Sequence, residues 1–242
     1  MRLFRTPRYE DVPELLDSVE GVSERDLRTT LRDIRRANIF GLGTWVIKHH
    51  LKDLLSDIPR DKPLRILDIA TGSGDIPEEL CRWARRERRD ISFVLSDISP
   101  EILGVARRRI ESAGFGENVS YVVCDAAALP FAQRSFDIVI CSLAFHHLNL
   151  RQAIKALEEM KSMAKTGFII NDIYRSRGAW LMALLLTRVT TTNKLTRHDG
   201  PASVLRAFTP PELRRMCDIV GVDGVIHKHP FWRAVLVGRV SP

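Results

Sequence analysis

A glycine-rich segment with an acidic residue at each end is the part of the chain best suited to bind a ligand. It runs from Asp68 to Asp75 and follows an apolar run that predicts a buried strand. Its glycines would let the backbone approach a bound molecule closely at the carboxyl edge of a sheet. A further carboxylate, Asp97, ends the next strand-like run about 20 residues beyond this turn, where it could hold both hydroxyls of a ribose. We therefore expect a nucleoside-containing cofactor at this edge.

The charges within the glycine-rich segment distinguish two kinds of cofactor. A dinucleotide places its pyrophosphate at the bare N-terminus of the following helix, and Gly or Ala ends its G-x-G-x-x-G motif. Here the three motif positions hold Ala70, Gly72 and Asp75, so an anion would stand where the pyrophosphate belongs. S-adenosylmethionine carries a sulfonium and an ammonium instead, and Asp68 and Asp75 are compatible with these cations. The pattern therefore favours S-adenosylmethionine.

The rest of the chain alternates strand-like and helix-like runs. The expected strands are 64–70, 91–96, 119–124, 136–141, 168–170, 222–227 and 232–237. The expected helices between them are 77–86, 99–110, 151–163 and 211–220. Mostly apolar strands that alternate with helices predict an α/β fold, here a Rossmann-like, doubly wound, mostly parallel seven-stranded sheet covered on both faces.

Two regions interrupt this alternation. Residues 1–60 contain only helical patterns, one after Ser23 and one over 44–55, and predict an N-terminal helical cap. Residues 61–242 form the expected cofactor-binding domain. Within it, residues 175–207 carry an apolar helix, 179–186, and a polar loop, 190–201, and predict a lid that binds the substrate.

Several motifs resemble those of class I S-adenosylmethionine-dependent methyltransferases, most closely the ubiquinone/menaquinone biosynthesis group and related small-molecule enzymes. They lie at 67–75, 96–99, 124–131, 135–139 and 206–213, and the resemblance covers about residues 62–240. It implies that Asp97 holds the ribose and that Asp125 accepts from the adenine amino group. The full set of cofactor-binding residues that it implies is Asp68, Ala70, Thr71, Gly72, Gly74, Asp97, Ile98, Asp125, Ala126 and Ser142.

A histidine pair follows the fourth expected strand, where quinone-type enzymes usually carry an asparagine. His146 is the candidate general base because an unperturbed imidazole titrates near neutral pH. Asp172 and His198 are lesser catalytic candidates. The residues expected to line the acceptor pocket are Trp45, His146, Tyr174, Trp180 and Phe208.

We expect O-methylation of a small hydroxylated aromatic or polyketide-like metabolite. C-methylation of a quinone-type precursor, methylation of RNA or protein, and cofactor binding without catalysis are the alternatives. The Asn/Asp-Pro-Pro-aromatic run of amino-methylating nucleic-acid enzymes is not present at residues 141–144, which read CSLA.

Composition narrows the expected partners. The net charge of +7 is largely arginine, but the densest arginine cluster, 82–89, contains a single aromatic residue, Trp83, and not the series of aromatics of a single-strand stacking surface, so nucleic acid is not expected. The four cysteines are too widely spaced for a zinc site or a disulfide framework, so no metal is expected. The longest apolar run, 179–186, is too short to span a bilayer, and the N-terminus does not resemble a signal peptide. These features predict a cytoplasmic protein and leave a peripheral membrane contact open.

Overall fold

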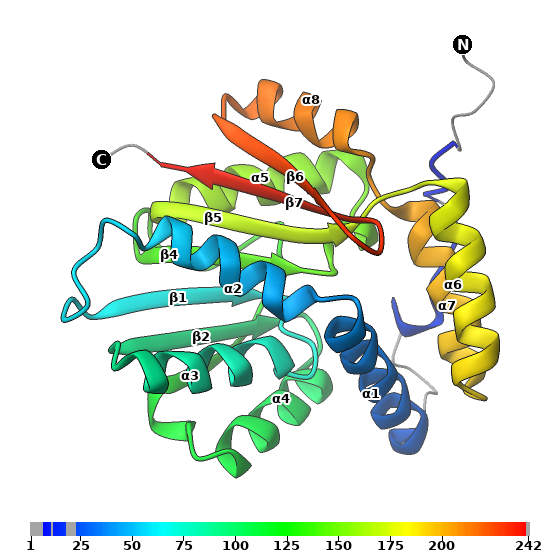
Figure 1. Cartoon of the computed structure of the whole chain (residues 1–242), viewed down its shortest axis with the longest axis horizontal. Helices are drawn as coiled ribbons and strands as arrows, with labels where there is room; N and C mark the ends of the chain where they lie inside the picture. Colours follow the sequence, from blue (N-terminus) through cyan, green and yellow to red (C-terminus); the bar gives the residue numbers. More distant parts are fainter. Residues whose placement is uncertain (1–6, 11, 18–22, 241–242) are drawn as a thin grey trace.

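A single seven-stranded sheet organises the molecule. The computed structural model describes residues 7–10, 12–17 and 23–240 (Figure 1). The strand order is β3-β2-β1-β4-β5-β7-β6. The strands are β1 (Leu64–Ile69), β2 (Ile91–Asp97), β3 (Val119–Val123), β4 (Phe136–Ser142), β5 (Ala164–Ile173), β6 (Gly224–His229) and β7 (Arg233–Arg239).

Strands β1 to β5 pair in parallel, and β7 runs antiparallel to both β5 and β6. The predicted mostly parallel, doubly wound α/β sheet is therefore confirmed. Because the order reverses beside β1, the carboxyl ends of β1, β2 and β4 meet at a switch point, where open α/β sheets bind their ligands.

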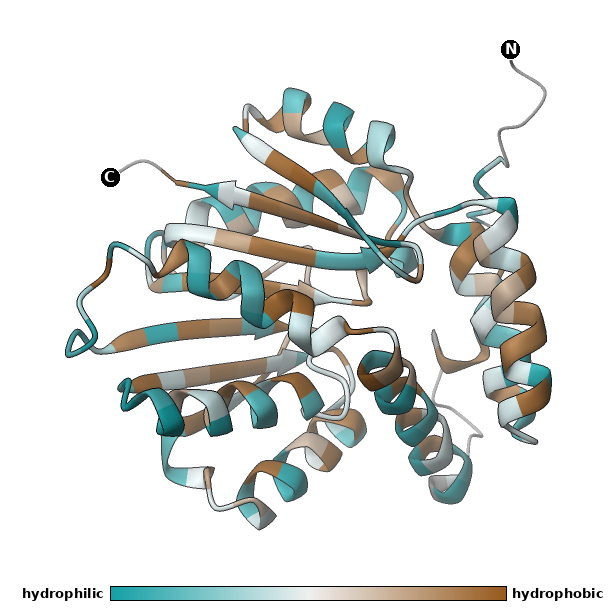
Figure 2. Ribbon diagram, viewed as in Figure 1, coloured by the Kyte–Doolittle hydropathy of each residue, from teal (hydrophilic) through white to brown (hydrophobic). Residues whose placement is uncertain are grey.

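Helices cover both faces of the sheet. One apolar core lies beneath α2 (Gly43–Leu54), α3 (Asp75–Glu87) and α4 (Pro100–Ser112), and the other beneath α5 (Leu150–Met163) and α8 (Pro210–Val220). In Figure 2 the strands are mostly brown, as expected for strands covered on both faces.

Helices α1 (Glu24–Phe40), α6 (Arg177–Thr190) and α7 (Lys194–Arg206) stand together at the carboxyl edge of the sheet (Figure 1). The predicted cap, 1–60, thus contains two different parts: α1 lies at this edge, whereas α2 packs on β5 and β7. The fully buried Val46, Ile47 and Leu51 make α2 part of the sheet's covering layer.

The expectation of a polar loop over 190–201 is wrong, because most of that segment belongs to α7. Gly200 and Pro201 are typical helix breakers, yet Pro201 lies inside the helix. Asn193 caps the helix through the N–H of Leu195 (2.9 Å). The buried Asp199 accepts from the N–H groups of Leu15 and Leu16 (2.8 and 3.1 Å), so contacts far apart in the sequence offset the weak local preference.

Within the described part of the chain, no helix is both long enough and apolar enough to cross a membrane.

Candidate functional site

The glycine turn after β1 leaves an open space beside its backbone. Ala70, Gly72 and Gly74 all have positive φ angles, of 53°, 56° and 71°. A Cβ added at Gly72 would meet no atom within 4 Å, whereas one at Gly74 would lie 3.1 Å from the Cβ of Ala106. Gly74 therefore permits close packing on α4, and Gly72 borders room that a ligand could occupy.

Asp97, at the end of β2, is held facing this turn. Its Oδ2 accepts from the N–H of Gly72 and its Oδ1 from the N–H of Ser99, both at 3.1 Å. Burial raises the pKa of the Asp97 carboxyl above its ordinary value, although both bonds oppose that change. The next side chain, Ile98, is 68% exposed. A rigid carboxylate beside an exposed apolar side chain suits a ribose that carries a flat apolar ring, so the site fits an adenosyl cofactor.

Two acidic residues, Asp68 and Asp75, lie at the two ends of the glycine turn. Burial, together with the nearby charges of Asp75 and Asp97, raises the pKa of Asp68 to about 7. Asp75 accepts from Ser73 Oγ (3.1 Å) and from Asn38 Nδ2 of α1 (3.2 Å). Nearby carboxylates stabilise the positive charge of a sulfonium or an ammonium group. Helix α1 contacts one of these carboxylates directly through the Asn38–Asp75 hydrogen bond.

Asp68→Asn is expected to stabilise the free protein above pH 7 and to weaken cofactor binding. In the native protein the pKa of this carboxyl is about 7, but in the unfolded chain it has its ordinary value of 3.8, so ionisation disfavours folding as the pH rises through that window. Asparagine removes this cost, which is on the order of 4 kcal/mol once the pH is above 7. Denaturant titrations at pH 5 and pH 8 would check the sign, and a variant that is less stable than wild type at pH 8 would contradict it.

The other predicted cofactor residues lie on loops or at a strand end at the same edge. Asp125 is exposed and accepts from the N–H of Ala127 (2.8 Å), and Ala126 packs against the second core. The N–H of Thr71 donates to the carbonyl of Ser96 (2.9 Å), which ties the turn to β2. Ser142, at the end of β4, accepts from Asn171 Nδ2 of β5 (2.9 Å).

His146 and Asp172 form a buried pair at the ends of β4 and β5. His146 Nδ1 lies 2.8 Å from Asp172 Oδ1, and the backbone N–H of His146 donates to Asp172 Oδ2 (3.0 Å). Both residues are about 5% exposed or less. With Nδ1 held by the carboxylate, Nε2 is the imidazole atom left to exchange a proton with another group.

The second neighbour of His146 is Glu14, which no sequence pattern singled out. Its Oε1 lies 3.7 Å from His146 Nε2, and its Oε2 accepts from Ser203 Oγ of α7 (2.8 Å). Glu14 therefore brings the N-terminal segment and α7 to the side of the imidazole that faces away from Asp172. A lone glutamate in a polar segment carries no local pattern that would have revealed this role.

Carboxylates on both sides determine the protonation of His146. Burial by itself lowers the pKa of His146, but the charges of Asp172 and Glu14 raise it above its ordinary value. Burial raises the pKa of Asp172, and His146 reverses that effect and holds it below its ordinary value. The pair therefore favours an imidazolium beside a carboxylate, and proton release from His146 requires a higher pH than for a free histidine.

Two buried arginines hold the segments around the site together through hydrogen bonds. Neither was among the site residues predicted from the sequence. Arg206 of α7 donates to the backbone carbonyls of His146 (3.3 Å) and His147 (2.8 Å). Arg233 of β7 donates to the carbonyl of Gly41 (2.7 Å) and to Asn38 Oδ1 (3.1 Å), which connects the end of α1 to the sheet. Burial lowers the pKa of Arg233 to about 10.

The remaining predicted residues are spread over three places. Phe208 is buried beneath the guanidinium of Arg8, and Tyr174 packs on the same core. His198 lies on α7 with Nδ1 2.9 Å from Asp199 Oδ1, and Trp180 is half-buried on α6. Trp45 stacks on His49 and meets His229 edge-on, so it belongs to a histidine cluster of α2 and β6.

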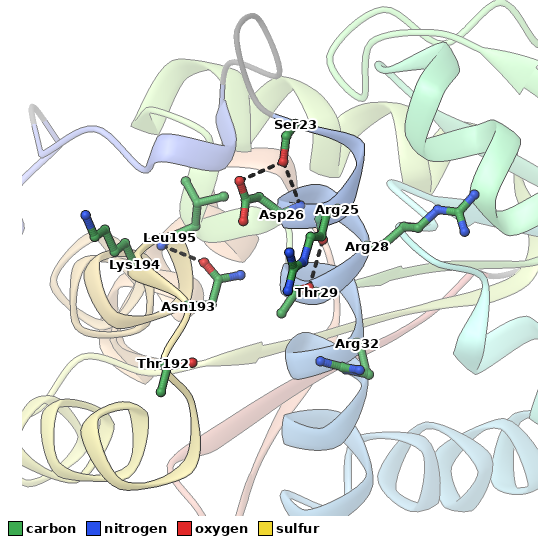
Figure 3. Close-up of a pocket in the computed structure, with 10 residues that line it drawn as sticks. All are labelled: Ser23, Arg25, Asp26, Arg28, Thr29, Arg32, Thr192, Asn193, Lys194 and Leu195. Carbon is green, nitrogen blue, oxygen red and sulfur yellow. Dashed lines mark hydrogen bonds between the residues drawn. The ribbon is translucent and has the colours of Figure 1, made fainter.

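A polar groove lies between the outer half of α1 and the start of α7 (Figure 3). Three arginines of α1, Arg25, Arg28 and Arg32, line it together with Lys194. None of the predicted site residues is among its lining residues. The groove is therefore a separate, basic feature between α1 and α7.

Comparison with known proteins agrees with this geometry. Residues 66–167 match the family model described as a methyltransferase domain. Together with the strand order and the glycine turn, this match supports the resemblance to class I S-adenosylmethionine-dependent methyltransferases that the sequence motifs indicated. The predicted cofactor and enzyme class are supported accordingly.

Curated relatives include the ubiquinone/menaquinone biosynthesis C-methyltransferases UbiE of Rickettsia prowazekii, 37% identical over 100 residues, and Hahella chejuensis, 36% identical over 102 residues. The first match covers 41% of this chain and 40% of that relative, and the second covers 42% and 39%. The chain therefore matches about two fifths of the length of these relatives.

Solved structures share the fold over a longer stretch. Magnesium protoporphyrin IX methyltransferase from Synechocystis, with bound S-adenosylmethionine, is 15% identical with a TM-score of 0.61, over 92% of this chain and 94% of that one. A S-adenosylmethionine-dependent methyltransferase from Aquifex aeolicus is 16% identical with a TM-score of 0.57, over 78% and 89%. At these identities the likeness establishes the fold.

Proposed function

We propose that the protein transfers the methyl group of S-adenosylmethionine to a hydroxyl oxygen of a small hydroxylated aromatic or polyketide-like molecule. The observation that carries this proposal is the His146–Asp172 pair, which lies at the same sheet edge as the glycine turn and Asp97. His147, next to His146, is close enough to Asp97 to influence its carboxyl electrostatically. The proposed base is therefore adjacent in sequence to a residue whose charge reaches the proposed ribose-binding carboxylate.

The proposed cofactor would be held by the chain's own groups around the turn. Asp97 would bind the ribose hydroxyls, Ile98 would cover the adenine, and Asp68 would face the cationic end. When bound, S-adenosylmethionine supplies an activated methyl group on a sulfonium. The protein then has to exclude water, align the acceptor and remove one proton.

The proposed base is His146, acting through Nε2. Asp172 holds Nδ1 and stabilises the imidazolium that forms when Nε2 takes the proton of the acceptor hydroxyl. A phenol has a pKa near 10, so about one molecule in a thousand is ionised at pH 7 and a base is needed for fast transfer. Because Glu14 occupies the space beside Nε2, an acceptor has to displace or hydrogen-bond to Glu14 to reach the imidazole.

C-methylation of a quinone-type precursor is the second candidate, and it is favoured by the names of the curated relatives. The same base would serve it, since removing a proton from a ring hydroxyl raises the electron density of the neighbouring ring carbon. The two candidates therefore differ in the atom that faces the methyl group and share the proton acceptor.

An apolar part of the acceptor is supported by α6. Its outer face carries four exposed aliphatic side chains, and Val189 is 85% exposed. The four are Leu181, Leu185, Leu186 and Val189. Contiguous exposed apolar surface commonly marks a site of contact with a ligand or a membrane. We propose that lipophilic acceptors, free or held at a membrane surface, approach the site past this helix.

Incubation with methyl-labelled S-adenosylmethionine and two panels of acceptors tests the proposal. One panel holds phenols and enolic polyketide-like lactones, and the other holds hydroquinones with an unsubstituted ring carbon. Label recovered as a methyl ether supports O-methylation, and label on ring carbon supports the second candidate. Tight cofactor binding with no labelled product from either panel would contradict both.

Glu14→Gln is expected to shift the pH dependence of turnover to lower pH. Glu14 helps to raise the pKa of His146, so loss of its charge lowers that pKa and leaves more neutral imidazole at a given pH. The acidic limb of kcat against pH should therefore move to lower pH, with cofactor affinity little changed. Ser203→Ala, which removes a bond to Glu14 without removing its charge, is the matched control. An unmoved limb in Glu14→Gln would show that Glu14 does not act on the proton acceptor.

A further inference from the structure

Helix α6 carries an exposed apolar stripe. Five large side chains form it, each at least 41% exposed: Leu181, Met182, Leu185, Leu186 and Val189. At 100° per residue these five positions fall within an arc of about 140° around the helix. Thr187, on the opposite side of the helix, packs against Gly200 of α7. The α6 stripe is therefore the outer face of the α6–α7 pair.

The segment that carries the α6 stripe is rich in cations. Between positions 177 and 198 the chain contains three arginines and one lysine, and neither an aspartate nor a glutamate. Arg188, Lys194 and Arg197 are exposed. Arg188 immediately precedes Val189, which is the most exposed residue of the stripe. Positive charge therefore borders the apolar surface at the end of α6 and the start of α7.

Helix α1 adds further cations where α6 joins α7. Asp33 Oδ2 of α1 accepts from Thr191 Oγ1 (2.7 Å) and from Thr196 Oγ1 (3.0 Å), and Thr30 Oγ1 accepts from Asn193 Nδ2 (2.9 Å). These bonds hold the connection between α6 and α7 against α1, beside the basic groove. The arginines of α1 that line this groove are Arg25, Arg28 and Arg32 (Figure 3). The end of the α6 stripe and the basic groove therefore adjoin one another.

We propose that the α6 stripe and the basic groove together dock the protein on a membrane surface that contains anionic lipids. A helix that lies in the plane of a membrane buries an apolar face among the acyl chains and holds Lys and Arg at the level of the headgroups. Leu185 and Val189 would enter the bilayer, and Arg188 and Lys194 would face lipid phosphates. Helix α6 has 14 residues, so it would lie on the membrane and not cross it.

The chemistry of the surface favours a lipid membrane over other partners. Stable protein interfaces are commonly anchored by aromatic side chains, and the α6 stripe has none. A nucleic acid would pair with the arginines of the groove, but it would leave the stripe in water. A membrane with anionic lipids takes up the apolar side chains and the positive charges at the same time.

The purpose of the docking rests on the proposed function, because lipophilic acceptors dissolve in membranes. Helix α7 runs from Lys194, beside the docking surface, to Arg206, which donates to the carbonyl of His146 (3.3 Å). A helix of this length spans about 20 Å. Docking would therefore bring a membrane-dissolved acceptor to within about one helix length of the proposed base.

Co-sedimentation of the full-length protein with lipid vesicles tests the docking without any methyl acceptor. We expect binding to vesicles of equimolar phosphatidylcholine and phosphatidylglycerol, weaker binding at high salt, and little binding to phosphatidylcholine alone. Leu185→Glu should weaken binding to the anionic vesicles at least roughly tenfold, because it places a charge where an apolar side chain would be buried. Lys194→Glu should weaken it at least about fivefold, because one cation is lost from the surface.

Two exposed residues of α8 provide matched control variants. Ile219→Glu replaces an aliphatic side chain that is 64% exposed, and Arg215→Glu replaces an exposed cation. Both should bind the anionic vesicles as wild type does. Circular dichroism and S-adenosylmethionine affinity, which should be unchanged in all four variants, check that each variant is folded.

Three results would overturn the docking surface. They are equal vesicle binding by wild type and Leu185→Glu, equal binding of wild type to neutral and anionic vesicles, and binding of an RNA oligonucleotide in place of vesicles. A dimer in solution that Leu185→Glu dissociates, without vesicle binding, would assign the stripe to a second copy of the chain and overturn the inference as well. Vesicle binding as expected, with no labelled product from the acceptor panels, would instead refute the proposed function and leave the docking surface standing.

Discussion

His146→Ala is expected to lower kcat by at least ~100-fold at pH 7, the usual contribution of a positioned general base. The substitution removes the imidazole bonded to Asp172 and leaves the glycine turn and Asp97 intact. Cofactor affinity should therefore change little. The measurement is single-turnover methyl transfer with an acceptor found by the labelling screen, over a range of pH. Higher pH should partly restore the rate of the variant, because more of the acceptor is then ionised in solution.

Asp172→Asn separates the base from the residue that positions it. The Asp172 charge raises the pKa of His146, so its loss should lower that pKa and move the acidic limb of the kcat profile to lower pH. A merely structural Asp172 would change stability without moving that limb. His147→Ala, which alters the neighbouring ring and leaves the buried pair in place, is the matched control. Equal kcat in wild type and His146→Ala across the pH range would refute the general-base role of His146. Catalysis would then depend on the positioning of the two substrates.

The position of the glycine turn beside Asp97 could be predicted, because the residues that determine it are close together in the sequence or end neighbouring strands. Asp68, Gly72 and Gly74 lie within one turn, and each has a backbone or charge requirement that is readable from neighbouring residues. Asp97 follows from the end of the next strand. Parallel strands bring their carboxyl ends to one edge, so the order of elements was enough to place these residues together. The structure adds the two bonds that hold Asp97 at the turn.

The surroundings of the proposed base could not be predicted, because they depend on contacts between distant segments. Glu14 reaches His146 across more than a hundred residues, and Arg206 braces the same loop from α7. Local sequence preferences do not predict helix α7, because Gly200 and Pro201 are helix breakers and a single capping residue, Asn193, does not offset them. Its stability comes from Asp199 and Ser203, whose partners lie in the N-terminal segment. Trp45 was expected near the acceptor because of its type, yet its ring contacts join it to the histidine cluster.

Asp97→Ala is expected to weaken S-adenosylmethionine binding by about 1.5–3 kcal/mol, or roughly 10- to 150-fold in Kd. This range applies to hydrogen bonds to a charged group, and the Asp97 carboxylate would make them to the ribose hydroxyls. The same carboxylate accepts from the N–H groups of Gly72 and Ser99, so its removal also loosens the turn that borders the cofactor. Calorimetry with the cofactor and with its demethylated product measures the loss.

The matched control for this loss is Asp97→Asn, which keeps one carbonyl oxygen to accept a hydrogen bond but removes the charge. We expect an intermediate affinity, because one acceptor remains while the charge-assisted part of each bond is lost. Denaturant titration of both variants separates the loosened turn from the lost ligand contacts: a defect confined to the turn would lower stability in proportion to affinity. Wild-type affinity in Asp97→Ala, or binding of NADH in place of S-adenosylmethionine, would refute the assignment of this edge to an adenosyl sulfonium. Such a result would also remove the reason for placing the methyl acceptor beside His146.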